Sequence, residues 1–455
     1  MCHLLFGDFL NNLYMVLHRT GGYKMNKIEE EVFELNGFNL HLVPSKKYKT
    51  INVVAKFKAP LTRETITKRA LLPYILRQGT KRYPSRREIQ SKLDDLYGAV
   101  LSIDGAKKGD NHIISMRMEL ANQKFIPNES SILDDAIELL AEVMFQPPVK
   151  EDAFHTDVFN RESETLKQKM AAIIDNKMSY ANMRLIDEMC EGETYQLHVH
   201  GYEEDLRTMT PENLYNYYQQ LIKDDDLDIY VLGDFDPEEM KSKIGALIKR
   251  DKQNISPELQ SNSPAVKQQD KPQVVIEKQN IQQAKLHLGF RTHCTFADDD
   301  YFALQVFNGI FGGFPSSKLF INVREKNSLA YYAASRFESH KGLLLVFSGI
   351  AANDYEKAKE IIELQMTAMK NGDFTEETLQ ETKELIVNQL LETMDHPQGI
   401  IELLYQQVLG NKKLPPEQLI AQIKQVTKED VINIAGKIEE DTVYLLTSEG
   451  GTSIE

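Results

Sequence analysis

The chain has 455 residues, of which 42% are hydrophobic and 27% are charged, and its 68 acidic residues outnumber the 53 basic ones to give a net charge of −15. This length is too great for one ordinary domain, so at least two domains are expected. The acidic balance argues against a nucleic-acid partner and against an anionic membrane surface, because both need a basic face on the protein.

Residues 1–25 are apolar in character, but Asp8, Asn11 and Asn12 interrupt them, and they lack both a basic start and a small-residue cleavage site. A signal peptide is therefore disfavoured. We interpret this segment as a leader or a mis-assigned start. No stretch of the chain reaches 18 clean apolar residues, so no membrane-spanning helix is predicted. Three scattered cysteines without CxxC spacing favour a reducing, cytoplasmic location.

The rest of the chain uses one plan of strands and helices twice. Strand-like alternation opens each half, a helix with a glycine turn follows, an amphipathic segment comes next, and a capped helix with a strand closes the half. The paired segments are 51–59 and 285–292, 74–80 and 306–313, 134–145 and 355–366, and 227–235 and 441–450.

A polar segment rich in Gln, Ser, Lys and Pro, residues 251–272, separates the two halves and is interpreted as a linker. The sequence therefore predicts an N-terminal domain at 26–250 and a C-terminal domain at 273–455. Both are expected to be α+β domains in which helices pack on a sheet.

Motifs for metal, nucleotide or serine chemistry are missing from the sequence. None of HExxH, HxxEH, a Walker loop, GxGxxG or GxSxG is present. The closest histidine pair is His198-Val-His200, and alternate strand positions would place both rings on one face. No carboxylate at helical spacing completes a ligand set, so a zinc site built on His198 and His200 remains only an alternative.

Residues 307–336, FNGIFGGFPSSKLFINVREKNSLAYYAASR, contain SSKLF followed by VREKxxLAY, which is a fairly specific pattern. The segment closely resembles the second half of M16-type peptidases, the family of insulinase and mitochondrial processing peptidase. The two-part plan matches that family from about residue 30 to 450. The resemblance implies two homologous α/β-sandwich halves, of the metallohydrolase fold that LuxS shares, which form a clam-shell and hold peptide between them.

In active members of that family the first half carries HxxEH on a helix, where two histidines bind Zn²⁺ and the glutamate is the general base. Aligned with that motif, ALLPYILRQGT places Ala70 at the first histidine, Pro73 at the base and Tyr74 at the second histidine. The more distant glutamate ligand falls at Lys169. A methyl group, a proline ring, a phenol and an ammonium cannot hold zinc. The resemblance therefore implies no zinc and no catalytic residue in this chain.

Proline in a helix interior costs roughly 3 kcal/mol, because it removes a donor and clashes with the preceding turn. We therefore expect the helix around Pro73 to kink there or to begin late.

In active relatives an arginine and a tyrosine seven residues apart help to hold the substrate carbonyl, and Arg324 and Tyr331 keep that spacing. Both side chains can donate hydrogen bonds to a developing oxyanion. Gly312 and Gly313 resemble a shortened glycine-rich loop that the family associates with substrate handling. The alternatives are a buried arginine beside a packed aromatic, and a tight turn that requires glycine dihedrals.

The resemblance implies a non-catalytic subunit that binds peptide or protein substrate and pairs with a zinc-bearing M16 partner or with itself. It is strongest to an inactive bacterial group linked with modification of elongation factor P. Two alternatives stay open, a free-standing peptide-binding or scaffold protein and a zinc peptidase with a displaced metal site.

Overall fold

The structure of the chain is a computed structural model that describes residues 28–35, 37–127, 131–250 and 271–449. The predicted leader at 1–25 and all but the last two residues of the predicted linker at 251–272 lie outside the described residues. The elements of the first half are β1 (Glu31–Leu35), β2 (Phe38–Pro44), β3 (Thr50–Pro60), α2 (Ile66–Leu76), α3 (Arg86–Asp95), β4 (Val100–Lys108), β5 (Asn111–Ala121), η1 (Gln123–Phe125), α4 (Ile132–Phe145), β6 (Val149–Lys150), β7 (Ala153–Phe154), α5 (Thr156–Asp175), α6 (Lys177–Met189), η2 (Thr194–Gln196), α7 (Glu203–Thr208), α8 (Pro211–Asp224), β8 (Asp226–Gly233) and α9 (Pro237–Leu247). Those of the second half are β9 (Gln273–Gln279), β10 (Ala284–Arg291), α10 (Tyr301–Asn308), η3 (Gly309–Gly313), η4 (Phe320–Glu325), β11 (Ala330–Glu338), β12 (Leu343–Ile350), η5 (Ala352–Asp354), α11 (Tyr355–Lys370), α12 (Glu376–Met394), α13 (Pro397–Leu409), α14 (Pro416–Gln425), α15 (Lys428–Lys437) and β13 (Glu439–Ser448).

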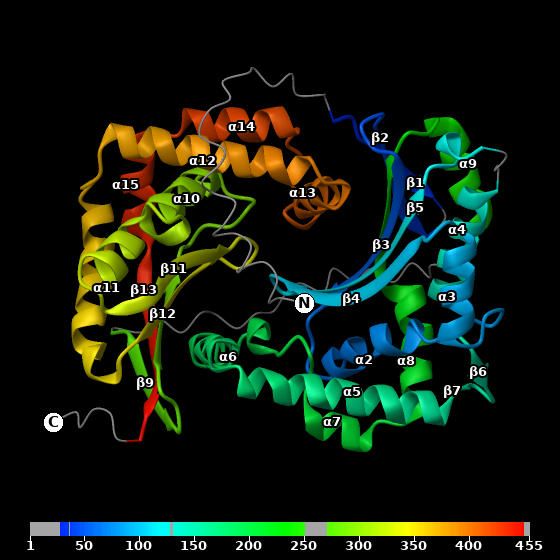
Figure 1. Cartoon of the computed structure of the whole chain (residues 1–455), viewed down its shortest axis with the longest axis horizontal. Coiled ribbons are helices and arrows are strands. Elements are labelled where there is room, and N and C mark those ends of the chain that lie inside the picture. Colours follow the sequence, from blue (N-terminus) through cyan, green and yellow to red (C-terminus); the bar gives the residue numbers. More distant parts are fainter. Residues whose placement is uncertain (1–27, 36, 128–130, 251–270, 450–455) are drawn as a thin grey trace.

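Each half contains one large mixed sheet, and the two sheets repeat one topology (Figure 1). The first sheet has the strand order β1-β2-β8-β3-β5-β4, and the second has the order β11-β12-β10-β13-β9. In each sheet one strand pair is parallel, β2 with β8 and β9 with β13, and the other pairs are antiparallel. Apart from the additional β1, the sheets correspond strand by strand. The paired strand segments at 51–59 and 285–292, and at 227–235 and 441–450, fall on equivalent strands.

The predicted helix caps also recur at equivalent places, and both are capping boxes. The hydroxyl of Thr210 accepts the Asn213 backbone N–H at the start of α8, and the hydroxyl of Thr427 accepts the Asp430 backbone N–H at the start of α15. Each cap satisfies a donor that the first helical turn leaves without a partner. Strand β8 follows α8 and strand β13 follows α15, so the closing unit of each half has the same form.

Helices cover the outer face of each sheet, where most of the apolar core lies (Figure 1). In the first half, Leu71, Leu72 and Ile75 of α2 pack in one cluster with Val53 and Phe57 of β3. Each such side chain, when fully buried, contributes about 1.5–3 kcal/mol relative to an exposed position. Helix α2, which carries the candidate site, is therefore fixed to its sheet by its apolar face.

The inner face of each sheet is covered by a helix from the other half. Helix α6 of the first half packs on β10 and β13 of the second sheet, where Leu185 and Met189 lie in one cluster with Leu345 and Tyr444. Helix α13 is the second-half equivalent of α6, because α6 directly follows the long helix α5 and α13 directly follows the long helix α12. This exchange of helices was not predicted from the sequence.

Helix α13 packs in the same way on the inner face of the first sheet (Figure 1). Its residues Ile401 and Leu404 lie in one cluster with Val54 and Leu232. The two halves therefore bury apolar surface reciprocally, and neither sheet keeps its inner face covered if the halves separate.

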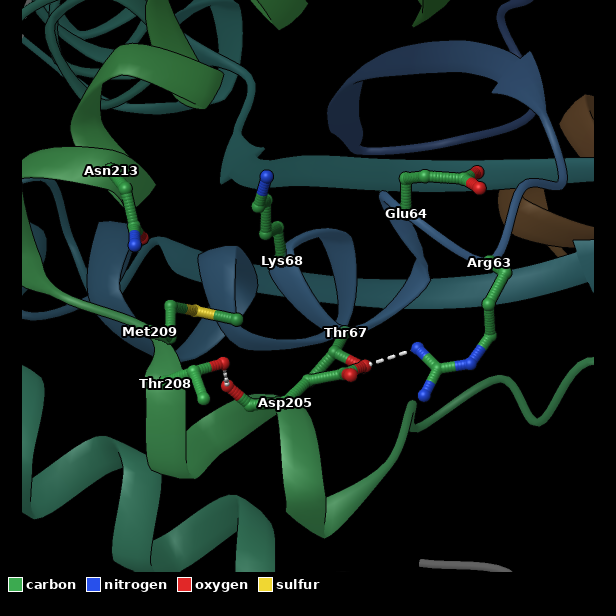
Figure 2. A pocket seen from close by; sticks show the side chains of 8 residues that line it. All are labelled: Arg63, Glu64, Thr67, Lys68, Asp205, Thr208, Met209 and Asn213. Carbon is green, nitrogen blue, oxygen red and sulfur yellow. Dashed lines mark hydrogen bonds and ion pairs between the residues drawn. The ribbon is translucent and has the colours of Figure 1, made fainter.

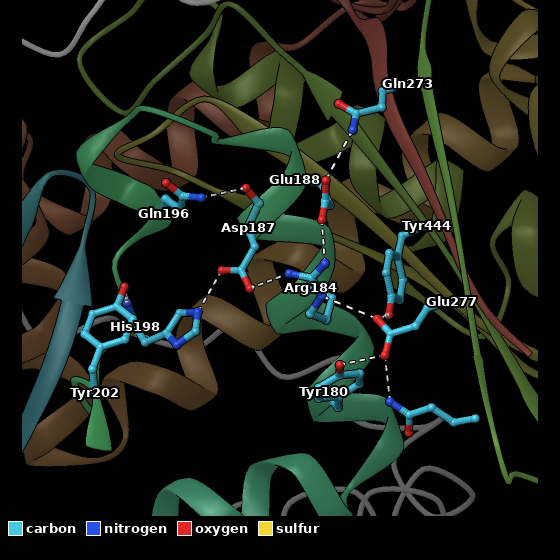
Figure 3. Close-up of polar contacts among 11 residues, drawn as sticks. Tyr180, Arg184, Asp187, Glu188, Gln196, His198, Tyr202, Gln273, Glu277 and Tyr444 are labelled. Atoms are coloured by element: carbon cyan, nitrogen blue, oxygen red, sulfur yellow. Dashed lines mark hydrogen bonds and ion pairs between the residues drawn. The ribbon is translucent and has the colours of Figure 1, made fainter. Parts of the chain in front are cut away.

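Polar contacts fasten the exchanged helix α6 to the second sheet (Figure 3). The carboxylate of Glu277 on β9 accepts hydrogen bonds from the hydroxyls of Tyr180 and Tyr444, both at 2.7 Å, and lies 3.4 Å from Nε of Arg184. Charge-assisted hydrogen bonds of this kind are directional, so they add a fixed orientation to the apolar contact.

Helix α2 contains Pro73 in its interior, and the expectation of a late start was wrong because the helix begins at Ile66. The proline cannot donate to the carbonyl four residues earlier. The start of the helix is held instead by Arg69, which is fully buried and whose guanidinium donates to Asp225 at 2.7 Å and to Nδ1 of His112 at 2.9 Å. Anchoring by this buried arginine allows the helix to tolerate the proline.

We predict that one buried histidine makes the contact between the halves sensitive to acid. His287 of β10 is fully buried on the face that α6 covers, with its ring perpendicular to that of Phe347, and burial lowers the pKa of His287 to about 3. The unfolded chain binds this proton below about pH 6.5, so the free energy of unfolding falls by about 1.4 kcal/mol per pH unit between pH 6.5 and 3 through this group.

Urea unfolding at pH 7 and at pH 5 checks this, because His287→Leu should lose less stability on acidification than the unchanged protein. The matched control is His155→Leu at an exposed histidine. Equal losses in the two variants and the unchanged protein would contradict the prediction.

Candidate functional site

Helices α2 and α5 and strand β4 enclose a cavity of about 130 Å³ at the edge of the first sheet. Its lining includes Ala70, Pro73, Tyr74 and Lys169, which are the four positions that correspond to the zinc ligands and the base of active M16 peptidases. The structure therefore brings all four together, and it places Lys169 of α5 beside α2 as the alignment implied.

The donor set around this cavity does not fit zinc. Ala70 contributes only a methyl group, and the ring of Tyr74 lies between two cations, with Cζ of Arg77 at 4.7 Å and Nζ of Lys169 at 5.8 Å from its centroid. Zinc requires imidazole, thiolate or carboxylate ligands, and two neighbouring cations would repel it. Among the described residues no group of three or more His, Cys, Asp or Glu side chains could hold a metal ion.

Three further polar residues line the cavity, namely Arg77, Asp104 and His200. The sequence singles out only His200 of these, as half of a candidate histidine pair. Asp104 reaches the cavity from β4, whereas His200 reaches it through the loop after η2. Burial lowers the pKa of His200 to about 4, and the charge of Lys169 acts in the same direction. The imidazole is therefore neutral at pH 7 and leaves the positive charge of the cavity to lysine and arginine.

His198 and His200 have separate surroundings. Nε2 of His198 lies 2.7 Å from Oδ1 of Asp187, and its ring stacks on Tyr202 with 5.0 Å between centroids (Figure 3). His200 instead lines the cavity beside Tyr74. The pair therefore forms no joint ligand set with a carboxylate among the residues described.

A second cavity, of about 240 Å³, lies between the inner face of the first sheet and α13. Asp104 lines this cavity as well as the first, so the two adjoin along β4. Across it, Nζ of Lys56 lies 2.5 Å from the Glu402 carboxylate and 4.6 Å from the centroid of the Tyr405 ring. The exchanged helix α13 therefore forms one wall of the candidate site.

A third cavity, of about 400 Å³, lies at the start of α2, away from these two (Figure 2). Two of its charged lining residues, Arg63 and Asp205, are paired with each other. Nη1 of Arg63 lies 2.6 Å from Oδ2 of Asp205, and the Thr67 hydroxyl donates to the same carboxylate oxygen. These contacts tie α2 to α7, and we assign this cavity a structural role.

In the second half, Gly312 and Gly313 belong to the π-helical turn η3. Neither has a positive φ, so the expectation that this turn requires glycine dihedrals was wrong. A Cβ atom on Gly312 would lie 2.4 Å from Oγ and 2.7 Å from the backbone N of Ser335. Gly312 is therefore needed for the close approach of η3 to β11, whereas Gly313 is exposed.

Arg324 and Tyr331 lie at two irregularities of the second half. Arg324 is in the π-helical turn η4, with its guanidinium 4.6 Å from the Phe320 ring centroid, and it forms no ion pair with any described residue. The pairing of β11 with β12 shifts between Ala330 and Tyr332, so Tyr331 has no cross-strand partner and is 74% exposed. The alternative of a packed aromatic is therefore wrong for Tyr331. π-turns and β-bulges are frequent at functional sites.

No helix within the described ranges is long and apolar enough to cross a membrane.

Comparison with known proteins shows similarity over nearly the whole chain. The family model described as Peptidase M16 inactive domain matches residues 208–386. The probable inactive metalloprotease YmfF of Bacillus subtilis (strain 168) is 46% identical over 429 residues, which cover 94% of this chain and 100% of that protein. The uncharacterized zinc protease YmxG of the same organism is 27% identical over 66% of this chain and 74% of its own length.

A solved structure shows the same similarity. The crystal structure of a conserved protein from Enterococcus faecalis V583 is 31% identical and superimposes with a TM-score of 0.84, covering 93% of this chain and 100% of that chain.

We predict that three substitutions create a zinc site in the first cavity. Residues 70 and 74 lie one turn apart on α2, so imidazoles there share one face, and the side chain of residue 169 lies beside position 74. The combination Ala70→His, Tyr74→His and Lys169→Glu should bind about one Zn²⁺ per chain, because three protein ligands suffice for an open zinc site.

Metal analysis after dialysis measures the zinc content. The matched control replaces Lys169→Glu by Lys167→Glu, which puts the carboxylate on the same helix but outside the cavity. Equal zinc content in the two triple variants would show that the cavity lacks the arrangement of a former metal site.

Proposed function

The chain belongs to the M16 peptidase family, and we propose that it acts as a non-catalytic member that holds a peptide between its halves and pairs with a zinc-bearing M16 partner. The observation that carries this proposal is a difference between the two halves: the first half lacks the family's metal-binding side chains, whereas the second half keeps its substrate-contacting ones. The metal positions Ala70, Pro73 and Tyr74 lack zinc-binding chemistry but line one cavity, whereas Arg324 and Tyr331 keep the residue types that contact substrate in active relatives. Tyr331 is exposed, and Arg324 is half-buried.

Each sheet has an edge strand near one of these two groups of residues, the metal positions of the first half and Arg324 with Tyr331 of the second, and these edges support peptide binding. Strand β4 is an edge of the first sheet, and β11 is an edge of the second. An edge strand presents unpaired N–H and C=O groups, to which an extended peptide can add as a further strand. Because Ile103, Asp104 and Gly105 of β4 also line the first cavity, a peptide on this edge would pass directly over it.

Arg324 and Tyr331 supply donors for a peptide backbone. The guanidinium of Arg324 has no carboxylate partner among the described residues, and the Tyr331 side chain is mostly in solvent. Both groups can therefore donate to a peptide carbonyl without first breaking an internal ion pair.

A zinc-bearing partner would supply the hydrolysis that this chain lacks. Two relatives from one organism, Bacillus subtilis (strain 168), support such a division, since one is named a probable inactive metalloprotease and the other an uncharacterized zinc protease. Cys190 and Cys294 are buried and free, which supports a reducing location such as the cytoplasm.

Purification of the tagged chain from its own cells tests the pairing. We expect one M16 protein with an intact HxxEH motif to co-purify in stoichiometric amount, as identified by mass spectrometry and sized by analytical ultracentrifugation. A monomer that leaves such a protein unbound in the same extract would contradict the pairing. Peptide binding by that monomer would favour the scaffold alternative.

We predict that Arg324 and Tyr331 contribute to peptide affinity and little to stability. Arg324→Ala should weaken peptide binding by about 1.5–3 kcal/mol, and Tyr331→Phe by about 0.5–1.5 kcal/mol, the usual values for charged and neutral hydrogen bonds. Titration by fluorescence anisotropy measures both. The control is Arg207→Ala on α7, where the side chain is 72% exposed. Affinities equal to that of the control would exclude contact between these residues and the peptide.

A further inference from the structure

Cations gather around the two adjoining cavities of the first half although the whole chain carries a net charge of −15. Only two carboxylates, those of Asp104 and Glu402, line the same space. The cationic lining residues are Arg77 and Lys169 in the first cavity and Lys56, Lys108 and Arg117 in the second. In an acidic protein, this local excess of positive charge marks a binding surface for an anionic group.

Three of these cations lack a counter-ion. Lys108, Arg117 and Lys169 form no ion pair with any residue that the structure describes, and Nε of Arg117 is buried without a hydrogen-bond partner. Glu402 is already engaged by Lys56 at 2.5 Å. Asp104 is therefore the remaining carboxylate of the lining for three unpaired cations.

This arrangement is unfavourable unless a further anion binds. Like charges repel each other, and a buried donor without a partner destabilises the folded chain. A carboxylate in either cavity would accept from these donors and offset the repulsion. In the first cavity it would also meet the neutral ring of His200, which can donate one more hydrogen bond.

We propose that the two cavities bind a peptide segment that carries carboxylate groups, with Lys169 and Arg117 as the main cationic contacts. The inference rests on the proposed function and specifies its substrate class. The carboxylate can come from Asp or Glu side chains or from a peptide C-terminus. A basic peptide is excluded, because it would add to the positive charge already present.

Strand β4 gives the geometry for such recognition. A peptide that extends along its free edge advances about 3.3 Å per residue, and alternate side chains point to the same side. Carboxylates two residues apart are then roughly 6–7 Å apart along the strand. Asp104 lines both cavities, so a peptide on this edge passes both the cavity of Lys169 and that of Arg117.

Four decapeptides with a neutral dye at the N-terminus test the proposal by fluorescence anisotropy. They are (Ala-Glu)5 amide, (Ala-Gln)5 amide, (Ala-Gln)5 with a free C-terminal carboxylate, and (Ala-Lys)5 amide. We expect the glutamate peptide to bind at least tenfold more tightly than the amidated glutamine peptide and the lysine peptide to bind least. The free-acid glutamine peptide distinguishes a C-terminal carboxylate from side-chain carboxylates as the preferred source.

Two near-isosteric variants, Lys169→Met and Arg117→Met, should each weaken binding of the glutamate peptide roughly tenfold and leave that of the amidated glutamine peptide unchanged. The matched control is Lys167→Met on the same helix, because Lys167 pairs with Glu203 and lines neither cavity. Thermal unfolding of every variant shows whether it is folded.

The binding results distinguish a failure of this inference from a failure of the proposed function. Equal affinity for the glutamate and amidated glutamine peptides, with binding still lost on Arg324→Ala, would overturn the carboxylate preference and leave peptide binding intact. Binding of none of the four peptides would overturn both. A glutamate preference that survives Lys169→Met and Arg117→Met would place the anion elsewhere and overturn the site.

Discussion

The reciprocal exchange of α6 and α13 is the contact on which the rest of the structure depends. Each helix covers the inner face of the sheet in the other half, so the halves bury apolar surface that neither could cover alone. Because α13 also carries Glu402 and Tyr405, the same exchange builds one wall of the cavity beside Lys56. The interior between the halves is thus formed by the pairing between them.

The positions of the family's zinc ligands carry different side chains in this chain, on a helix that is held in place independently of a metal. Arg69 anchors the first turns of α2 through Asp225 and His112, and the apolar face of the helix packs on β3. Pro73 and Tyr74 therefore lie on a helix whose position does not depend on them. With Lys169 and Arg77 beside Tyr74, this cavity carries ammonium and guanidinium charge.

Much of this architecture could be predicted from the sequence, because local patterns determine it. The alternation at 51–59 and 285–292 marks β3 and β10, and Thr210 and Thr427 begin helices in both halves. The motif around Ala70 and Tyr74 marked positions that the structure places in one cavity with Lys169. The exchange of α6 and α13 and the place of Arg117 were not predicted, because they arise from packing between distant segments. The sequence indicates His200 only as half of a histidine pair. The need for glycine at position 312 was also not predicted, because it comes from Ser335 on β11, which leaves no room for a side chain there.

Hydrogen exchange measured by mass spectrometry, with and without the (Ala-Glu)5 peptide, tests the central claim most directly. That claim is that a peptidase framework without its metal holds an acidic peptide along β4. The account predicts that peptide slows the exchange of the amides of β4, residues Val100–Lys108, because their free edge gains hydrogen-bond partners. It predicts no change in α7, where the separate cavity around Asp205 lies. Unchanged exchange in β4 at saturating peptide, or protection confined to α7, would contradict it.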